Sequence, residues 1–164
     1  YKGKNNFVAH ECILDFRDLK SKTGLSVNDL AKRLIDYSFH APTISWPVPE
    51  TIMIEPTESE SLAELDRFCE AMLLIGEEIS EIENNHELKN NNVISNAPHT
   101  LKELIADNWH YPYSKEKASF PYKTPTTIKF WSSVSRINNA YGDRNLICSC
   151  NVNQGETFEE KKCA

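Results

Sequence analysis

The sequence predicts an α+β domain with an antiparallel sheet and helices on one face. A period-two alternation over residues 7–16 is typical of a half-buried strand, and two short β-rich runs follow between prolines. Two further segments repeat apolar residues at helical spacing, each behind a capping-box pattern. Strands and helices that follow one another in this order favour antiparallel pairing beneath a layer of helices.

The first strand and helix are predicted from their apolar faces. Over residues 7–16, His10 lies on the same side as Cys12, and Glu11 lies on the opposite side. The box Ser26-x-x-Asp29 then opens a helix that ends near Phe39, with its buried face formed by Val27, Leu30, Ala31, Leu34 and Ile35.

Prolines at 42, 47, 49 and 56 divide residues 40–56 into the runs 43–46 and 51–54, predicted to pair as a ribbon that turns at 47–50. A second box, Thr57-x-x-Glu60, predicts a long helix to about Glu83. Its predicted buried stripe is Leu62, Leu65, Phe68, Cys69, Met72, Ile75, Ile79 and Ile82.

The remaining sequence has weaker patterns. Residues 84–96 are rich in Asn and predict a loop, Thr100 predicts the N-cap of a short helix, and residues 109–131 predict irregular structure. Residues 1–150 are expected to form one domain, with a polar, frayed tail over 151–164.

Composition excludes several classes of protein. The net charge of 18 − 24 = −6 has no basic block, which argues against nucleic-acid binding. No apolar run is long enough to cross a membrane. Residues 50–83 contain eleven acids and one base, and we interpret them mainly as a solvated helix face.

Five cysteines are too few for a disulfide scaffold and favour a reducing compartment. Cys12 and Cys69 are predicted to be small buried apolar residues. Cys148 and Cys150 form a C-x-C pair without a second pair at zinc spacing, so no metal site is predicted. We expect this pair to be either redox-sensitive and accessible or part of a last buried strand.

Three segments carry candidate chemistry, each beside a structural alternative. His40 follows a helix next to rigid prolines, where it can also serve as a C-terminal cap. The segment 55–60 joins a strand to a helix, where ordinary capping is the alternative and its glutamates disfavour an anionic ligand. Arg144 follows a Gly–Asp turn, where the structural alternative is a contact that holds the C-terminal tail against the rest of the domain.

These segments also resemble a known family. Two segments are similar to the C-terminal region of the glycine cleavage system P-proteins. They are residues 39–72, which begin FHAPTISWPVPETIMIEPTESES, and residues 138–150, NNAYGDRNLICSC. VAHECILDFRDLK (8–20) and YSKEKASFP (113–121) fit the same pattern in the same order. Two departures are Glu50, where the family usually has Gly, and the Asn-rich stretch at 84–96.

The resemblance implies the small C-terminal domain of a fold-type-I, aminotransferase-like enzyme that uses pyridoxal phosphate. It implies decarboxylation of glycine and transfer of the aminomethyl group to the lipoyl group of the H-protein, an oxidoreductase reaction. It also implies contact with the rest of the P-protein, a dimer, and the mitochondrial matrix or bacterial cytoplasm. The family's cofactor lysine, beside a glycine-rich stretch, does not occur in these residues, so we expect the chain alone to be inactive.

The resemblance also implies which residues form the active-site wall: His40, Thr43, Glu55, Thr57, Glu58 and Ser59, with Arg144 as a candidate for binding a carboxylate. Two alternatives remain open. One is the small domain of another fold-type-I enzyme, and the other is an interaction module without catalysis.

Overall fold

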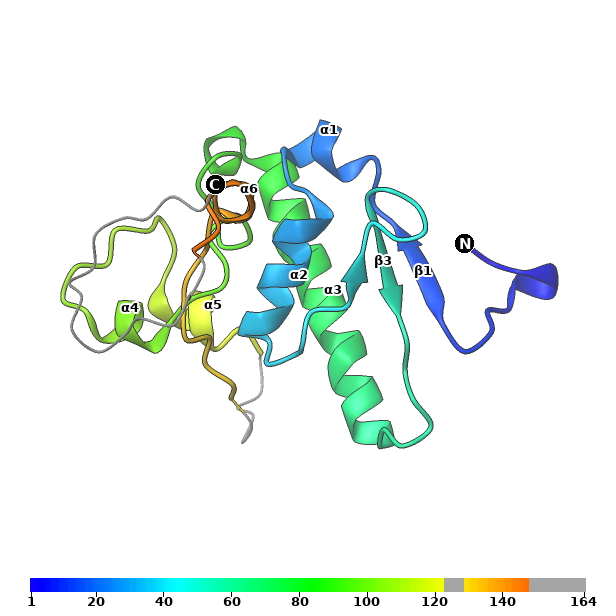
Figure 1. Ribbon diagram of the computed structural model, residues 1–164. Helices are drawn as coiled ribbons and strands as arrows, with labels where there is room; N and C mark the ends of the chain where they lie inside the picture. Colours follow the sequence, from blue (N-terminus) through cyan, green and yellow to red (C-terminus); the bar gives the residue numbers. More distant parts are fainter. Residues whose placement is uncertain (123–128, 148–164) are drawn as a thin grey trace, which may run out of the picture.

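The computed structural model describes residues 1–122 and 129–147, and Figure 1 shows their arrangement. Strands β1 (Cys12–Asp15), β2 (Thr43–Ile44) and β3 (Thr51–Ile54) form an antiparallel sheet in the order β1-β3-β2. The helices are α1 (Leu19–Thr23), α2 (Val27–Asp36), α3 (Leu62–Asn84), α4 (Leu101–Ile105), α5 (Lys115–Ser119) and α6 (Asn139–Arg144), with 3-10 turns η1 (Lys4–Asn6) and η2 (His86–Leu88). The predicted α+β class and antiparallel sheet are confirmed.

The core lies between the sheet and helices α2 and α3. Ile52 at the centre of β3 is fully buried, and Ile44 and Ile54 lie on the same face of the sheet. They belong to one cluster with Leu34 of α2 and Ile75 of α3, so most of the predicted apolar faces do meet. The prediction that Leu62 is buried was wrong, because this residue is 74% exposed at the start of α3. In the part of the chain that the structure describes, no helix is long and apolar enough to span a bilayer.

The first strand is shorter than the sequence predicts. Ladder pairing with β3 begins only at Cys12, and residues 1–10 are all exposed. The prediction of a strand from residue 7 was therefore wrong, because β3 ends at Ile54 and offers no partner beyond Cys12. The alternation of apolar residues in one strand does not show where its partner strand ends.

The ribbon of β2 and β3 is confirmed, with Thr43 opposite Met53 and Ile44 opposite Ile52. Its turn holds Glu50 at φ 57°, the left-handed region that favours glycine. A glycine at this position, as the resemblance leads us to expect for the family, would adopt this φ without strain. In this chain the Glu50 carboxylate accepts a hydrogen bond from the amide of Val27, the first residue of α2, at 3.3 Å.

Helix α3 begins four residues later than its capping pattern predicts. Ser61 is the N-cap and accepts a hydrogen bond from the amide of Glu64 at 3.2 Å, whereas Thr57 and Ser59 lie in the connection before it. The buried positions of the helix are Ala71, Leu74, Ile75, Glu78 and Ile82. Cys69 is exposed, so the prediction that it is buried was wrong, and Cys12 is only half-buried.

The C-terminal half is held by short helices and side-chain bonds. Helix α2 has the predicted Ser26–Asp29 box, and α4 has a box of its own, in which Thr100 caps the helix and its amide donates to Glu103. Helix α5 lies in a segment predicted to be irregular, so that prediction was wrong over residues 115–119. Arg136 then fastens the last described segment to the body through Asp29 and the carbonyl oxygens of Ile94 and Ala97.

A set of polar side chains, buried except for the half-buried Tyr113, joins α2 and α3 to the 97–120 segment, and we call it the Arg33 network. Its members are Arg33, Asp36, Glu78, His99 and Tyr113. The guanidinium of Arg33 has no solvent exposure and grips the Glu78 carboxylate with two hydrogen bonds of 3.0 and 2.6 Å. Its other N–H groups donate to Asp36 at 2.9 Å and to the carbonyl oxygens of Lys117 and Ala118. All five guanidinium donors are therefore used.

The network continues from Asp36 to His99. The Asp36 carboxylate accepts the backbone amide of His99 at 2.7 Å and lies 2.8 Å from His99 Nδ1. On its other side, His99 Nε2 lies 2.9 Å from the Tyr113 hydroxyl. Burial alone would lower the pKa of Arg33, but the adjacent Glu78 and Asp36 carboxylates outweigh burial and raise it above its ordinary value.

Candidate functional site at one end of the sheet

The antiparallel pairing gathers most of the predicted site segments at one end of the sheet. The start of β1, the start of β2 and the end of β3 all lie there, because neighbouring strands run in opposite directions. In Figure 1 the chain leaves β3 at this end and continues to the start of α3. Side chains that precede β1 and β2 thus come near those that follow β3.

The predicted residues fall at this end as follows. His40 is exposed and precedes β2, and Thr43 is the exposed first residue of that strand. Glu55 directly follows β3 and is exposed. Thr57, Glu58 and Ser59 are exposed in the connection to α3, where the Thr57 and Ser59 hydroxyls lie 2.9 Å apart.

Arg144 does not join them. It is the exposed last residue of α6, and Figure 1 places α6 across α2 from the sheet. Cys148 and Cys150, the predicted redox pair, lie outside the described residues.

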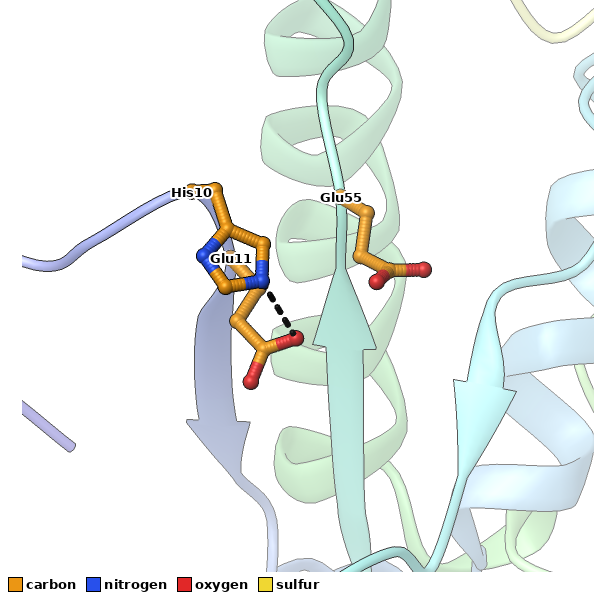
Figure 2. Close-up of side chains that lie close together, drawn as sticks. All are labelled: His10, Glu11 and Glu55. Atoms are coloured by element: carbon orange, nitrogen blue, oxygen red, sulfur yellow. Dashed lines mark ion pairs between the residues drawn. The ribbon is translucent and has the colours of Figure 1, made fainter.

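Two residues that the sequence did not predict complete the site. His10 and Glu11 precede β1, and each offers a ligand atom that lies within 4.8 Å of one from Glu55 and from the other. Figure 2 shows the His10 ring beside the Glu11 carboxylate, with Glu55 just beyond the end of the neighbouring strand β3. His10 Nε2 and Glu11 Oε2 are 3.6 Å apart. We call His10, Glu11 and Glu55 the sheet-end cluster.

Period-two alternation concealed this cluster. It places His10 and Glu11 on opposite faces of a strand, but regular strand geometry starts only at Cys12. The signal in the sequence that could have revealed the cluster is the adjacent His–Glu pair at a strand entrance, in antiparallel register with a Glu that follows the partner strand.

The charge at this end of the sheet is acidic. Residues 5–16 and 34–66, which form most of it, contain no Lys or Arg, and the nearby Arg67, whose guanidinium carbon lies 3.8 Å from the centre of the Phe39 ring, is paired with Glu64. These residues do not fit pyridoxal phosphate, because its phosphate needs cationic or N–H donors and its covalent bond needs a lysine. The imidazole and carboxylate groups can instead exchange protons or bind a cation.

Comparison with known proteins agrees with the segments quoted above. Residues 1–99 match the family model described as "Glycine dehydrogenase, C-terminal domain". The chain is 61% identical over 150 residues to a glycine dehydrogenase (decarboxylating) of Prochlorococcus marinus, a match that covers 92% of the chain and 16% of that protein. It is 57% identical over 150 residues to the corresponding protein of Vibrio parahaemolyticus, with 92% of the chain and 16% of that protein covered.

A eukaryotic relative is equally similar. The mitochondrial glycine dehydrogenase (decarboxylating) of Dictyostelium discoideum is 57% identical over 152 residues, with 92% of the chain and 15% of that protein covered. The chain therefore spans about one sixth of the length of these relatives. Since the family model matches more than half of the chain and these identities run across nearly all of it, the chain belongs to the glycine dehydrogenase C-terminal domain family.

Proposed function

We propose that this chain forms the C-terminal part of a glycine dehydrogenase (decarboxylating), the P-protein of the glycine cleavage system. The observation that supports it most strongly is 61% identity over 92% of the chain to an enzyme of that name. The reaction releases CO₂ from glycine and passes the aminomethyl group to the lipoyl group of the H-protein. Pyridoxal phosphate supplies the electron sink for such a decarboxylation.

In this proposal the cofactor is bound by a fold-type-I domain outside these residues, and the chain contributes the small domain. The acidic character of the sheet end, where the nearby Arg67 is already paired with Glu64, supports a cofactor phosphate held elsewhere. The chain's own task is to close over the reacting groups and exclude water.

The proposed wall residues are His40, Thr43, Glu55, Thr57, Glu58 and Ser59. Their support is that the antiparallel sheet brings both segments to one end and leaves these side chains exposed toward whatever covers that end. A histidine or glutamate in that position can hold or move a proton at the lipoyl sulfur. Arg144, on α6, serves in this proposal at an interface with the rest of the enzyme.

The proposed partners are the remaining part of the P-protein, a second copy in a dimer, and the lipoylated H-protein. Relatives occur in bacteria and in a mitochondrion, which supports either the bacterial cytoplasm or the mitochondrial matrix as the compartment. The Cys148–Cys150 pair is proposed to be accessible to thiol reagents at the rim of the active site.

A hybrid enzyme tests this function. The matched C-terminal region of the Prochlorococcus marinus relative is replaced by this chain, and exchange of labelled bicarbonate into glycine is measured with pyridoxal phosphate and lipoylated H-protein. We expect activity within about tenfold of the relative. A folded hybrid that binds the cofactor but exchanges no bicarbonate would contradict the proposal.

Variants of the hybrid then test the wall. We expect His40→Ala or Glu55→Gln to reduce kcat by about 10²-fold, the low end of the effect of general acid–base groups. The matched control is Glu87→Gln, an exposed carboxylate in η2, which we expect to leave kcat unchanged. Equal kcat values in all three variants would show that His40 and Glu55 do not act in the active site.

A further inference from the structure

We propose that His10, Glu11 and Glu55 bind a divalent transition metal ion, with Zn²⁺ as the expected ion. The three side chains come from the residues just before β1 and just after β3, and present one ligand atom each within 4.8 Å of the others. This site goes beyond the proposed function and shares only Glu55 with the proposed wall, so His10→Ala and Glu11→Gln test the metal site separately from the wall.

The register of the sheet creates a charge problem that a cation would solve. Cys12 is opposite Ile54, so Glu11 and Glu55 come next to each other one residue beyond the end of the ladder. Like charges directly opposite on an antiparallel pair destabilise it. No described residue donates a hydrogen bond to Glu55, and neither segment that builds this end holds a Lys or Arg. A bound cation would neutralise both carboxylates at once.

The spacing of His10 and Glu11 suits a shared ion better than a hydrogen bond. Their nearest nitrogen and oxygen are 3.6 Å apart, beyond the usual 2.7–3.2 Å of an N–H···O bond. Two ligands at about 2.0–2.2 Å from a tetrahedral zinc are separated by roughly 3.3–3.6 Å. His10 and Glu11 already have a separation close to this, and the third ligand atom, from the exposed Glu55, lies within 4.8 Å of both.

The mixture of ligands selects the class of ion. Ca²⁺ and Mg²⁺ prefer sets of oxygen ligands, whereas an imidazole with carboxylates is typical of zinc and its neighbours. Three protein ligands leave a fourth tetrahedral position for water or for a group from another part of the enzyme. The ion would also link the exposed residues 1–10 to the residue that follows β3. The β1–β3 ladder makes no pair there, because it ends at Cys12 and Ile54.

The test is metal binding itself, with no glycine or cofactor present. Zn²⁺ is titrated into the chain, and into the hybrid described above, by calorimetry. Co²⁺ is added separately, because its visible absorption reports tetrahedral ligation. We expect one ion per chain and a loss of affinity of at least about tenfold in each of His10→Ala, Glu11→Gln and Glu55→Gln, since even outer-shell changes cost 10–100-fold.

The chain offers a matched control in His86 and Glu87, the same dipeptide in the exposed turn η2. The double variant His86→Ala/Glu87→Gln should bind Zn²⁺ as the parent does. Equal affinity in the parent and in all three cluster variants would overturn the proposal. So would an affinity for Mg²⁺ or Ca²⁺ that exceeds the affinity for Zn²⁺. Because the readout is binding, its failure leaves the bicarbonate-exchange result, and hence the proposed function, standing on its own.

Discussion

The Arg33 network and the sheet-end cluster both combine carboxylates with a histidine, yet they lie in opposite environments. In the network, Arg33 and His99 are buried, and every guanidinium donor has an acceptor. In the cluster, the His10 side chain is 82% exposed, and its contact with Glu11 is longer than a hydrogen bond. The same residue types therefore serve structure in one place and remain available for chemistry in the other.

The difference teaches which charges the fold needs. A buried carboxylate is tolerated only when paired and hydrogen-bonded, so removal of one partner in the network leaves an uncompensated charge. An exposed carboxylate at the sheet end stays hydrated by solvent when a neighbouring side chain is removed. Substitutions in the Arg33 network should therefore lower the free energy of unfolding more than substitutions in the sheet-end cluster. Substitutions in the cluster should instead have the larger effect on activity or ligand binding.

The largest expected effect comes from Arg33→Met. It leaves Glu78 and Asp36 buried without their cation, and we expect a loss of about 3–5 kcal/mol in the free energy of unfolding by urea. Arg33→Lys should lose less, because it keeps the charge but not the two-pronged grip on Glu78.

The control for Arg33 is Arg17→Met. Hydrogen bonds from Arg17 hold the pKa of Asp15 at about 2, but the pair is exposed, so we expect little change in stability. If Arg33→Met and Arg17→Met had equal effects, burial would not be what distinguishes the two pairs.

A smaller loss is expected for His99→Phe. The ring links Asp36 to the Tyr113 hydroxyl, and its removal takes one buried side-chain hydrogen bond from each of them. We expect a loss of about 1–3 kcal/mol, measured by urea unfolding. The exposed His86→Phe is the control, and a comparable loss there would show that the buried links contribute nothing.

The network also predicts a pH dependence through Lys129, whose ammonium donates to the carbonyl oxygen of Asp36 at the end of α2. Burial lowers the pKa of Lys129 from 10.5 to about 8. Between these values the unfolded chain holds a proton that the folded chain has released, so this group makes the folded state more stable as pH rises. Below pH 8 both states are protonated and the contribution of this group stays at its lowest.

The measurement is the difference in unfolding free energy between the parent chain and Lys129→Met across that range. We expect the difference to shift in favour of the parent by on the order of 1 kcal/mol, after allowance for partial exposure of the amine. The subtraction removes the contribution of tyrosines such as Tyr111, whose pKa burial raises to about 12. A flat difference would contradict the depressed pKa.

The sequence predicted the elements that depend on local pattern. The Ser26–Asp29 box places the start of α2 correctly, although the helix ends at Asp36 rather than near Phe39, and prolines mark the ribbon of β2 and β3. The resemblance also places His40, Thr43 and Glu55 in segments that the sheet does bring to one end.

What it missed depends on neighbours distant in the chain. Arg33 appears in the sequence as one more charge on a helix, and only Glu78, 45 positions later, explains its burial. Cys69 lies within an apolar pattern, but the face of the helix that is buried carries Ala71 and Glu78 instead. His10 and Glu11 become neighbours of Glu55 only through the register of β1 with β3.

The smallest expected effect sharpens the comparison at the sheet end itself. Two candidates for the N-cap of α3 lie four residues apart, and only Ser61 accepts the amide of Glu64. Ser61→Ala should therefore cost about 0.5–1 kcal/mol, because one free amide of the helix loses its acceptor. Thr57→Ala removes a hydroxyl whose hydrogen bond, among residues 1–122 and 129–147, is to Ser59 in the exposed connection, and should leave the unfolding free energy unchanged. In the hybrid enzyme the order should reverse, with Thr57→Ala lowering bicarbonate exchange more than Ser61→Ala, because Thr57 belongs to the proposed wall and Ser61 to the helix. Equal stability losses in the two variants would mean that α3 extends back to Thr57, and the polar residues 57–59 would then be helix caps rather than groups free to meet a substrate.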